Sequence, residues 1–185
     1  LREYHVNRGW YCDNIWVSEN GVDSNIFRPR KSESDITRIV THHWSDNAMK
    51  GTDVYEFIDD FVMQNPYKYS FTYIGRTQAR LKNTRIIDPL FGDALGRELA
   101  NHTVYVTGTR FDPAPNHCLE SISCGLPTYS HANGGGAAEF AGEDHVFEDV
   151  DELQDILEKR VFVKNNKQLQ SWKECISDYE SAFSV

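Results

Sequence analysis

The sequence of 185 residues predicts an α/β fold: a Rossmann-like parallel sheet of about six strands with helices on both faces. Short runs of β-branched and aromatic residues alternate along the chain with runs whose apolar residues recur at helical spacing. Such alternation is typical of a parallel sheet, because each crossover between strands requires a helix. In addition, polar motifs follow the ends of the predicted strands, which is where open α/β sheets bind ligands.

The first half of the predicted domain begins with a β-rich run, TRIVTHHW, followed by a helix, VYEFIDDFVMQN, that Pro66 stops. Next come two strands, YSFTYIG and TRIID, and a helix, LFGDALGRELAN, which its two glycines weaken. We expect these elements at residues 37–44, 54–65, 69–75, 84–88 and 90–101.

The second half repeats the alternation with three short strands, TVYVTG, LPTYS and HVF, and a helix between the first two. Two amphipathic helices follow, each with an apolar stripe at helical spacing. We expect these elements at residues 103–108, 117–124, 126–130, 145–147, 150–160 and 167–183.

The chain divides into three predicted parts. Residues 1–36 lack a long helical period and are interpreted as a connector from a preceding domain. Residues 37–165 form the predicted Rossmann-like domain, and residues 166–185 a C-terminal helix. Because the sequence opens without Met, signal region or transit peptide, we expect it to be part of a longer polypeptide.

Composition excludes several classes of protein. A formal net charge of -9 argues against a nucleic-acid binder, and no apolar run approaches the roughly 20 residues of a membrane span, so at most peripheral membrane contact is expected. The four cysteines form no CxxC pair, which disfavours a zinc site. Their scattered positions, Cys12 included, suit a reducing compartment, and we predict a cytoplasmic protein.

The stretch Phe111–Glu139, FDPAPNHCLESISCGLPTYSHANGGGAAE, contains most of the candidate ligand-binding groups. Asp112 precedes the predicted helix and Glu120 lies about one turn inside it, so both can face one cleft. Free N–H groups at the helix start can bind phosphate, and a carboxylate can accept hydrogen bonds from a vicinal diol. The Gly134–Gly136 loop permits close backbone approach to a ligand. The stretch predicts a site for a nucleotide-linked sugar.

Each signal also has an ordinary structural interpretation. Asp112 can be a turn residue, Glu120 an exposed helix residue, the glycines a flexible surface loop and Glu139 a solvated side chain. Lys50, just before the first helix, is either a surface residue or an ammonium placed to neutralise a diphosphate. The functional interpretation is favoured because these signals fall on the same edge of one sheet.

The order of these motifs resembles the C-terminal domain of GT-B glycosyltransferases, most closely the retaining group called family 4 or glycosyl transferases group 1. The resemblance covers residues 20–159 and rests on NGVDSNIFRP, a Lys-Gly before a helix, YIGR, the acidic pair eight residues apart, and CGLPTYSHANGGGAAEF. It implies that the chain binds a nucleotide-diphosphate sugar for retaining transfer. It implies that no cofactor or metal is needed. It also implies that an acceptor glycan, lipid or protein is held by an N-terminal half that this sequence lacks.

The resemblance also implies roles for individual residues. The catalytic pair is Asp112, near the transferred sugar, and Lys50, beside the diphosphate, while Glu120 holds the ribose. The remaining candidate donor-binding residues are Asn116 and His117 at the phosphates, Arg85 and Ile87 near the base, and Gly134, Gly135, Glu139 and Arg76. The sequence departs from the family twice: Asp112 replaces the usual Glu, and the usual arginine before the lysine is not apparent, with Arg76 or His43 as substitutes.

Other classes of protein fit less well. A non-catalytic nucleotide-sugar-binding or interaction module of the same fold remains open. A serine hydrolase lacks its G-x-S-x-G elbow, and a dinucleotide oxidoreductase lacks G-x-G-x-x-G after the first strand. The only candidate metal ligands, His42 and His43 with Asp46, are disfavoured because adjacent strand residues point to opposite faces.

Overall fold

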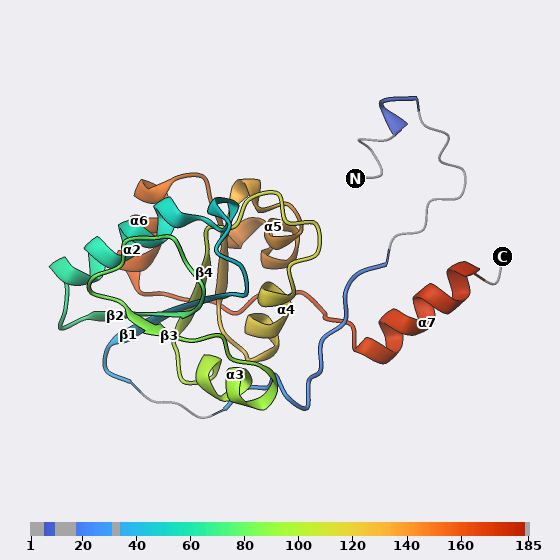
Figure 1. Ribbon diagram of the computed structural model, residues 1–185, viewed down its shortest axis with the longest axis horizontal. Coiled ribbons are helices and arrows are strands. Elements are labelled where there is room, and N and C mark those ends of the chain that lie inside the picture. Colours follow the sequence, from blue (N-terminus) through green and yellow to red (C-terminus); the bar gives the residue numbers. More distant parts are fainter. Residues whose placement is uncertain (1–5, 10–17, 31–33, 184–185) are drawn as a thin grey trace.

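A computed structural model describes residues 6–9, 18–30 and 34–183 (Figure 1). In this part of the chain one parallel sheet has six strands in the order β3-β2-β1-β4-β5-β6. The strands are β1 Thr37–His43, β2 Tyr69–Gly75, β3 Arg85–Ile87, β4 Val104–Thr107, β5 Thr128–His131 and β6 Val146–Phe147. The predicted Rossmann-like α/β fold is therefore confirmed.

Helices cover both faces of this sheet, as predicted. The α-helices are α2 Thr52–Gln64, α3 Gly92–Leu99, α4 Asn116–Ser123, α5 Gly136–Ala141, α6 Val150–Lys159 and α7 Trp172–Phe183. Adjacent β1 residues show why there are two cores: Ile39 packs with α2 and α6 on one face, and Val40 packs with α3, α4 and α5 on the other. Figure 1 shows α7 to one side of these layers.

Two segments differ from the sequence prediction. The predicted Gly134–Gly136 loop is instead a 3-10 helix, Ala132–Gly134, followed directly by α5, because a short helix of small residues gives only a weak sequence signal. The last helix begins at Trp172 rather than near residue 167. There, Val22 forms a β-bridge with Ser171 and its N–H donates to the Gln170 carbonyl at 2.9 Å, so the chain just before Trp172 pairs with residues near Val22 in an extended conformation. Cys12 and residues 1–5, 10–17 and 31–33 of the predicted connector lie outside the described residues.

Asp59, on α2, holds the turn that leads into β3. Its carboxylate accepts hydrogen bonds from the backbone N–H groups of Lys82 and Asn83, at 3.0 and 2.9 Å, and from the side chains of Asn83 and Thr84. Burial alone would raise the pKa of Asp59, but these hydrogen bonds outweigh it and leave the pKa below its usual range. The ionised carboxylate is therefore the stabilising form.

We expect Asp59→Asn to lower the free energy of unfolding by about 2 kcal/mol at pH 7, because four hydrogen bonds lose their charged acceptor. Since the pKa is lower in the folded than in the unfolded state, this contribution is full above about pH 4 and lost as the pH falls through the folded-state pKa. Urea unfolding at pH 7 and pH 3 measures both effects. The neighbouring, exposed Asp60→Asn is the control; an equal loss in both variants at pH 7 would contradict the assignment.

Candidate functional site

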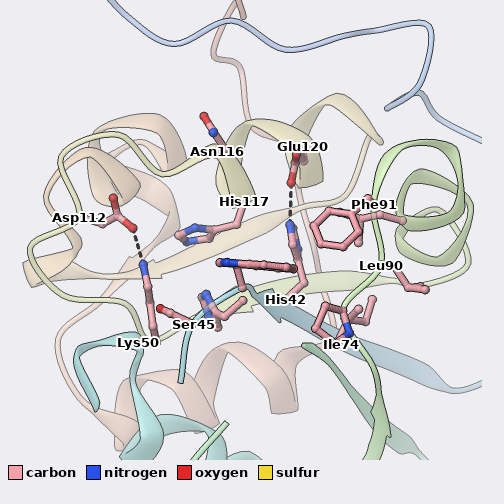
Figure 2. Close-up of a pocket in the computed structure, with 14 residues that line it drawn as sticks. His42, Ser45, Lys50, Ile74, Leu90, Phe91, Asp112, Asn116, His117 and Glu120 are labelled. Atoms are coloured by element: carbon pink, nitrogen blue, oxygen red, sulfur yellow. Dashed lines mark hydrogen bonds and ion pairs between the residues drawn. The ribbon is translucent and has the colours of Figure 1, made fainter. Parts of the chain in front are cut away.

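A cavity of about 450 Å³ opens at the carboxyl edge of the sheet, where the sequence predicts a ligand site (Figure 2). Its walls come from the end of β1 and the loop after it, the loop from β3 to α3, the loop after β4, and α4. The lining residues are His42, His43, Trp44, Ser45, Lys50, Ile74, Pro89, Leu90, Phe91, Leu95, Asp112, Asn116, His117 and Glu120. Five predicted site residues thus share one cavity: Lys50, Asp112, Asn116, His117 and Glu120.

Lys50 and Asp112 form an ion pair on one side of this cavity. Lys50 ends the 3-10 helix Ala48–Lys50, and its Nζ lies 2.7 Å from Asp112 Oδ2. The other carboxylate oxygen of Asp112 accepts the N–H of Ala114 at 3.2 Å, which fixes the side chain within its own loop. Both side chains are partly exposed to the cavity, so the ammonium and the carboxylate remain accessible to a ligand.

Glu120 forms a second pair on the other side of the cavity. Its Oε2 lies 2.7 Å from Nε2 of His42, which is buried at the end of β1. The His42 Nδ1 atom is also buried, and it has no hydrogen-bond partner among the described residues. Sequence reasoning missed this pair, because Glu120 and His42 are 78 positions apart and come together only through sheet order. The imidazole fixes the orientation of the carboxylate.

Two further histidines lie between these pairs. His117, near the start of α4, contacts the Thr107 hydroxyl through Nε2 at 3.2 Å, and its ring centroid lies 4.9 Å from that of His43. His43 Nε2 contacts the hydroxyls of Thr41 and Tyr55. Burial and then the neighbouring imidazoles and Lys50 hold the pKa of both histidines well below the usual range. Both imidazoles are therefore neutral in this structure at pH 7.

Two exposed aromatic residues line the mouth of the cavity. The Trp44 and Phe91 rings meet edge to face with centroids 4.8 Å apart, and the Arg76 guanidinium lies 4.5 Å from the centre of the Trp44 ring. Sequence reasoning missed both aromatics. The available signal was their position at the ligand-binding edge: Trp44 is the last residue of one predicted strand, and Phe91 follows the end of another within a few residues.

The other predicted site residues lie outside the cavity lining. Arg85 pairs with Glu98 at 2.7 Å, and Ile87 packs against the core beneath α3. Glu139 is exposed on α5, while Gly134 and Gly135 lie beside the Asp112 backbone. At the start of α4, the N–H groups of Asn116 and Cys118 bond the Ala114 and Pro115 carbonyls, and the Asn116 side chain accepts from Asn20 at 2.8 Å.

His42 and His43 diverge as expected for strand neighbours, toward Glu120 and toward Tyr55 respectively, yet both reach the cavity. Across the described residues, no group of three or more His, Cys, Asp or Glu side chains is arranged to hold a metal ion. None of the helices in the same part of the chain is both long enough and apolar enough to cross a bilayer.

The fold matches known glycosyltransferase structures. No protein-family model and no curated protein sequence matches the chain. The chain superposes over 99% of its length on TarM, with a TM-score of 0.76 at 11% identity, and over 99% on sucrose-phosphate synthase from Thermosynechococcus elongatus, with a TM-score of 0.74 at 14% identity. It spans 42% and 56% of those two chains.

A third match shows which part of such glycosyltransferases shares this fold. The match is the C-terminal domain of a group 1 glycosyl transferase, LpcC from Francisella tularensis, with a TM-score of 0.59 at 14% identity. The superposition covers 89% of this chain and 97% of the LpcC domain. The chain therefore has the fold of a GT-B glycosyltransferase. More narrowly, it has the fold of the C-terminal domain of the group 1 type, and the resemblance drawn from the sequence is confirmed at the level of fold.

The backbone conformation at position 51 explains why a glycine follows Lys50. Its backbone is left-handed, with φ 92° and ψ 43°, where it joins the 3-10 helix to α2. A Cβ at this position would lie 2.4 Å from backbone atoms of Gly108, in the loop after β4. The loop that carries Lys50 and the loop that leads to Asp112 therefore touch backbone to backbone, which brings the ion pair within reach.

We expect Gly51→Ala to destabilise the fold by more than about 2 kcal/mol, because the left-handed backbone alone costs roughly 1–2 kcal/mol and the clash with Gly108 adds to it. Gly92→Ala is the matched control, since Gly92 also has a positive φ but a Cβ there would meet no atom within 4 Å. Thermal and urea unfolding compare the two variants. Equal destabilisation would show that the contact with Gly108 is unimportant.

Proposed function

We propose that the cavity binds a nucleotide-diphosphate sugar and that the chain is the donor-binding domain of a retaining glycosyltransferase. The observation that carries this proposal is the convergence of Lys50, Asp112 and Glu120 on one cavity at the carboxyl edge of a GT-B C-terminal fold. In such sheets this edge is where nucleotides bind. A TarM variant of S. aureus with this fold was solved in complex with fondaparinux, alpha-GlcNAc-glycerol and UDP.

The roles follow from the chemistry of each group. Glu120, oriented by His42, accepts hydrogen bonds from the ribose diol. Asp112 accepts hydrogen bonds from the hydroxyls of the transferred sugar. The Lys50 ammonium has three donors, so it can hold Asp112 and still contact a phosphate oxygen.

In the proposed reaction the bond between the anomeric carbon and the diphosphate oxygen breaks, and the acceptor oxygen bonds to the same face of that carbon. The acceptor proton passes to the departing nucleoside diphosphate. Lys50 stabilises the negative charge that develops on the leaving group, a role that needs no metal ion and no nucleophilic side chain. The acceptor is held by a second domain, which in the proposed enzyme faces this edge of the sheet.

A second candidate function is a non-catalytic nucleotide-sugar-binding module of the same fold. One observation favours it: Asp112, one methylene shorter than the family's Glu, is tied to Lys50 and to its own loop. Binding of a nucleotide sugar with neither hydrolysis nor transfer, in a polypeptide that also contains an acceptor domain, would select the module over the enzyme.

A panel of UDP, GDP, ADP and TDP tests the proposed function. We expect one of them to raise the melting temperature of the protein by several degrees, since a ligand that binds only the folded state stabilises it by about 2.7 kcal/mol at 100 times its Kd. Differential scanning fluorimetry at millimolar nucleotide, with ribose 5-phosphate as the control ligand, is the measurement. The absence of a shift with all four nucleotides would refute the proposal.

Glu120 and Asp112 should differ in which part of the donor they bind. We expect Glu120→Ala to weaken binding of the nucleoside diphosphate about tenfold or more, because it removes the diol contact, worth about 1.5–3 kcal/mol. Asp112→Ala should not weaken that affinity and should weaken only the binding of the complete nucleotide sugar. Titration calorimetry with both ligands checks this, and the reverse ranking would overturn the assigned roles.

A further inference from the structure

The charges that line the cavity do not by themselves suit a diphosphate. Apart from His42, which pairs with Glu120, and the neutral His43 and His117, the lining contains one cation, Lys50, and two carboxylates, Asp112 and Glu120, so it has no surplus of positive charge. A diphosphate that joins a sugar to a nucleoside carries two negative charges. The charge of such a ligand is therefore not offset by this lining unless positive charge is added, and the effect is strong where the site is partly desolvated.

His117 and His43 are placed to supply this positive charge. Figure 2 shows His117 between the Lys50–Asp112 pair and the His42–Glu120 pair, which is the position between the sugar and ribose contacts of the proposed donor. His43 lies against it, with ring centroids 4.9 Å apart. Both imidazoles line the cavity, although each side chain is more than nine-tenths buried.

The hydrogen bonds of His43 and His117 suit either protonation state. The partners described for them are hydroxyl groups: Thr107 for His117, and Thr41 and Tyr55 for His43. A hydroxyl can donate to a neutral ring nitrogen or accept from a protonated one, so the contact survives a change of charge. His42 differs, because its partner is the Glu120 carboxylate. The first two histidines thus lack a counter-charge of their own, which a bound anion can supply.

The surroundings explain why the two rings are neutral without a ligand. The titratable groups that face them are His42 from β1, Lys50 from the 3-10 helix, Tyr55 from α2, Tyr73 from β2 and Tyr105 from β4. The three tyrosines are uncharged at pH 7, since burial raises the pKa of each, that of Tyr55 to about 12. The carboxylates of the cavity, Asp112 and Glu120, are already paired.

We propose that the imidazoles of His43 and His117 form the cationic floor of the diphosphate subsite and take up protons from solvent as the anion enters. The inference rests on the proposed function and deepens it, since it assigns these side chains to the phosphates. They supply the positive charge that the family's missing arginine would otherwise bring. Donor binding is then coupled to proton uptake. Affinity falls as the pH rises, through the range between the pKa of the empty site and the higher pKa of the occupied one.

The test uses nucleotide sugars, because their diphosphate does not itself titrate between pH 5 and 9. UDP-, GDP-, ADP- and TDP-glucose are screened at pH 6.5, and the tightest ligand is titrated calorimetrically in two buffers of different ionisation enthalpy. We expect uptake of about one proton per ligand at pH 6.5 and an affinity at least tenfold higher at pH 6.5 than at pH 8.5.

Substitutions of single histidines show which residues take up the protons when the ligand binds. We expect His117→Gln and His43→Gln each to reduce the proton uptake and flatten the pH dependence, because glutamine keeps a hydrogen-bonding group but does not titrate. His102→Gln is the matched control: this histidine also has a pKa lowered by burial, but it lies before β4, at the opposite end of the sheet. It should leave both quantities unchanged.

The outcomes separate the two proposals. Binding of a nucleotide sugar without proton uptake in the unsubstituted protein would overturn the histidine subsite and leave the proposed function standing. Uptake that survives both the His117 and His43 substitutions would overturn it as well. Failure of all four nucleotide sugars to bind at pH 6.5 would overturn both proposals. The wild-type measurement decides the question even where a variant fails to fold.

Discussion

The contact between Gly51 and Gly108 sets the geometry of the cavity. It joins the loops that follow β1 and β4, and neighbouring groups reinforce it: the Tyr55 hydroxyl accepts the N–H of Gly108, and Arg110 bonds the Met49 carbonyl and forms a double ion pair with Asp53. Neither glycine can carry a side chain without separating the loops. Lys50 and Asp112 meet across this junction because the backbones already touch.

The sequence was sufficient to predict the parts of the molecule that depend on local pattern. Strands such as Tyr69–Gly75 and the placement of Lys50 and Asp112 at one edge follow from periodicity and from the rule that parallel strands end together. The pairing of His42 with Glu120 was beyond that reasoning, because it depends on which strand lies at the centre of the sheet. Arg85 and Ile87 were predicted to lie near the base of the nucleotide. Instead, the Arg85 side chain pairs with Glu98 and the Ile87 side chain packs against the core.

The cavity combines a buried polar floor with an exposed aromatic rim. Its histidines contact hydroxyls rather than solvent, so they are held in place by packing, while Trp44 and Phe91 remain largely exposed. The exposed rings at the rim can stack on a flat, apolar part of a ligand.

The backbone around Asp112 is fixed to the start of α5: its N–H bonds the Gly134 carbonyl, its carbonyl accepts the Gly136 N–H at 2.8 Å, and it forms a β-bridge with Gly135. A glutamate replaced by aspartate loses about 1.5 Å of reach, the length of one carbon–carbon bond. Because this loop cannot advance without breaking those hydrogen bonds, the lost reach is not recovered by the protein. In the proposed enzyme this shortening leaves about 1.5 Å more room on the face of the transferred sugar toward Asp112 than a glutamate would leave.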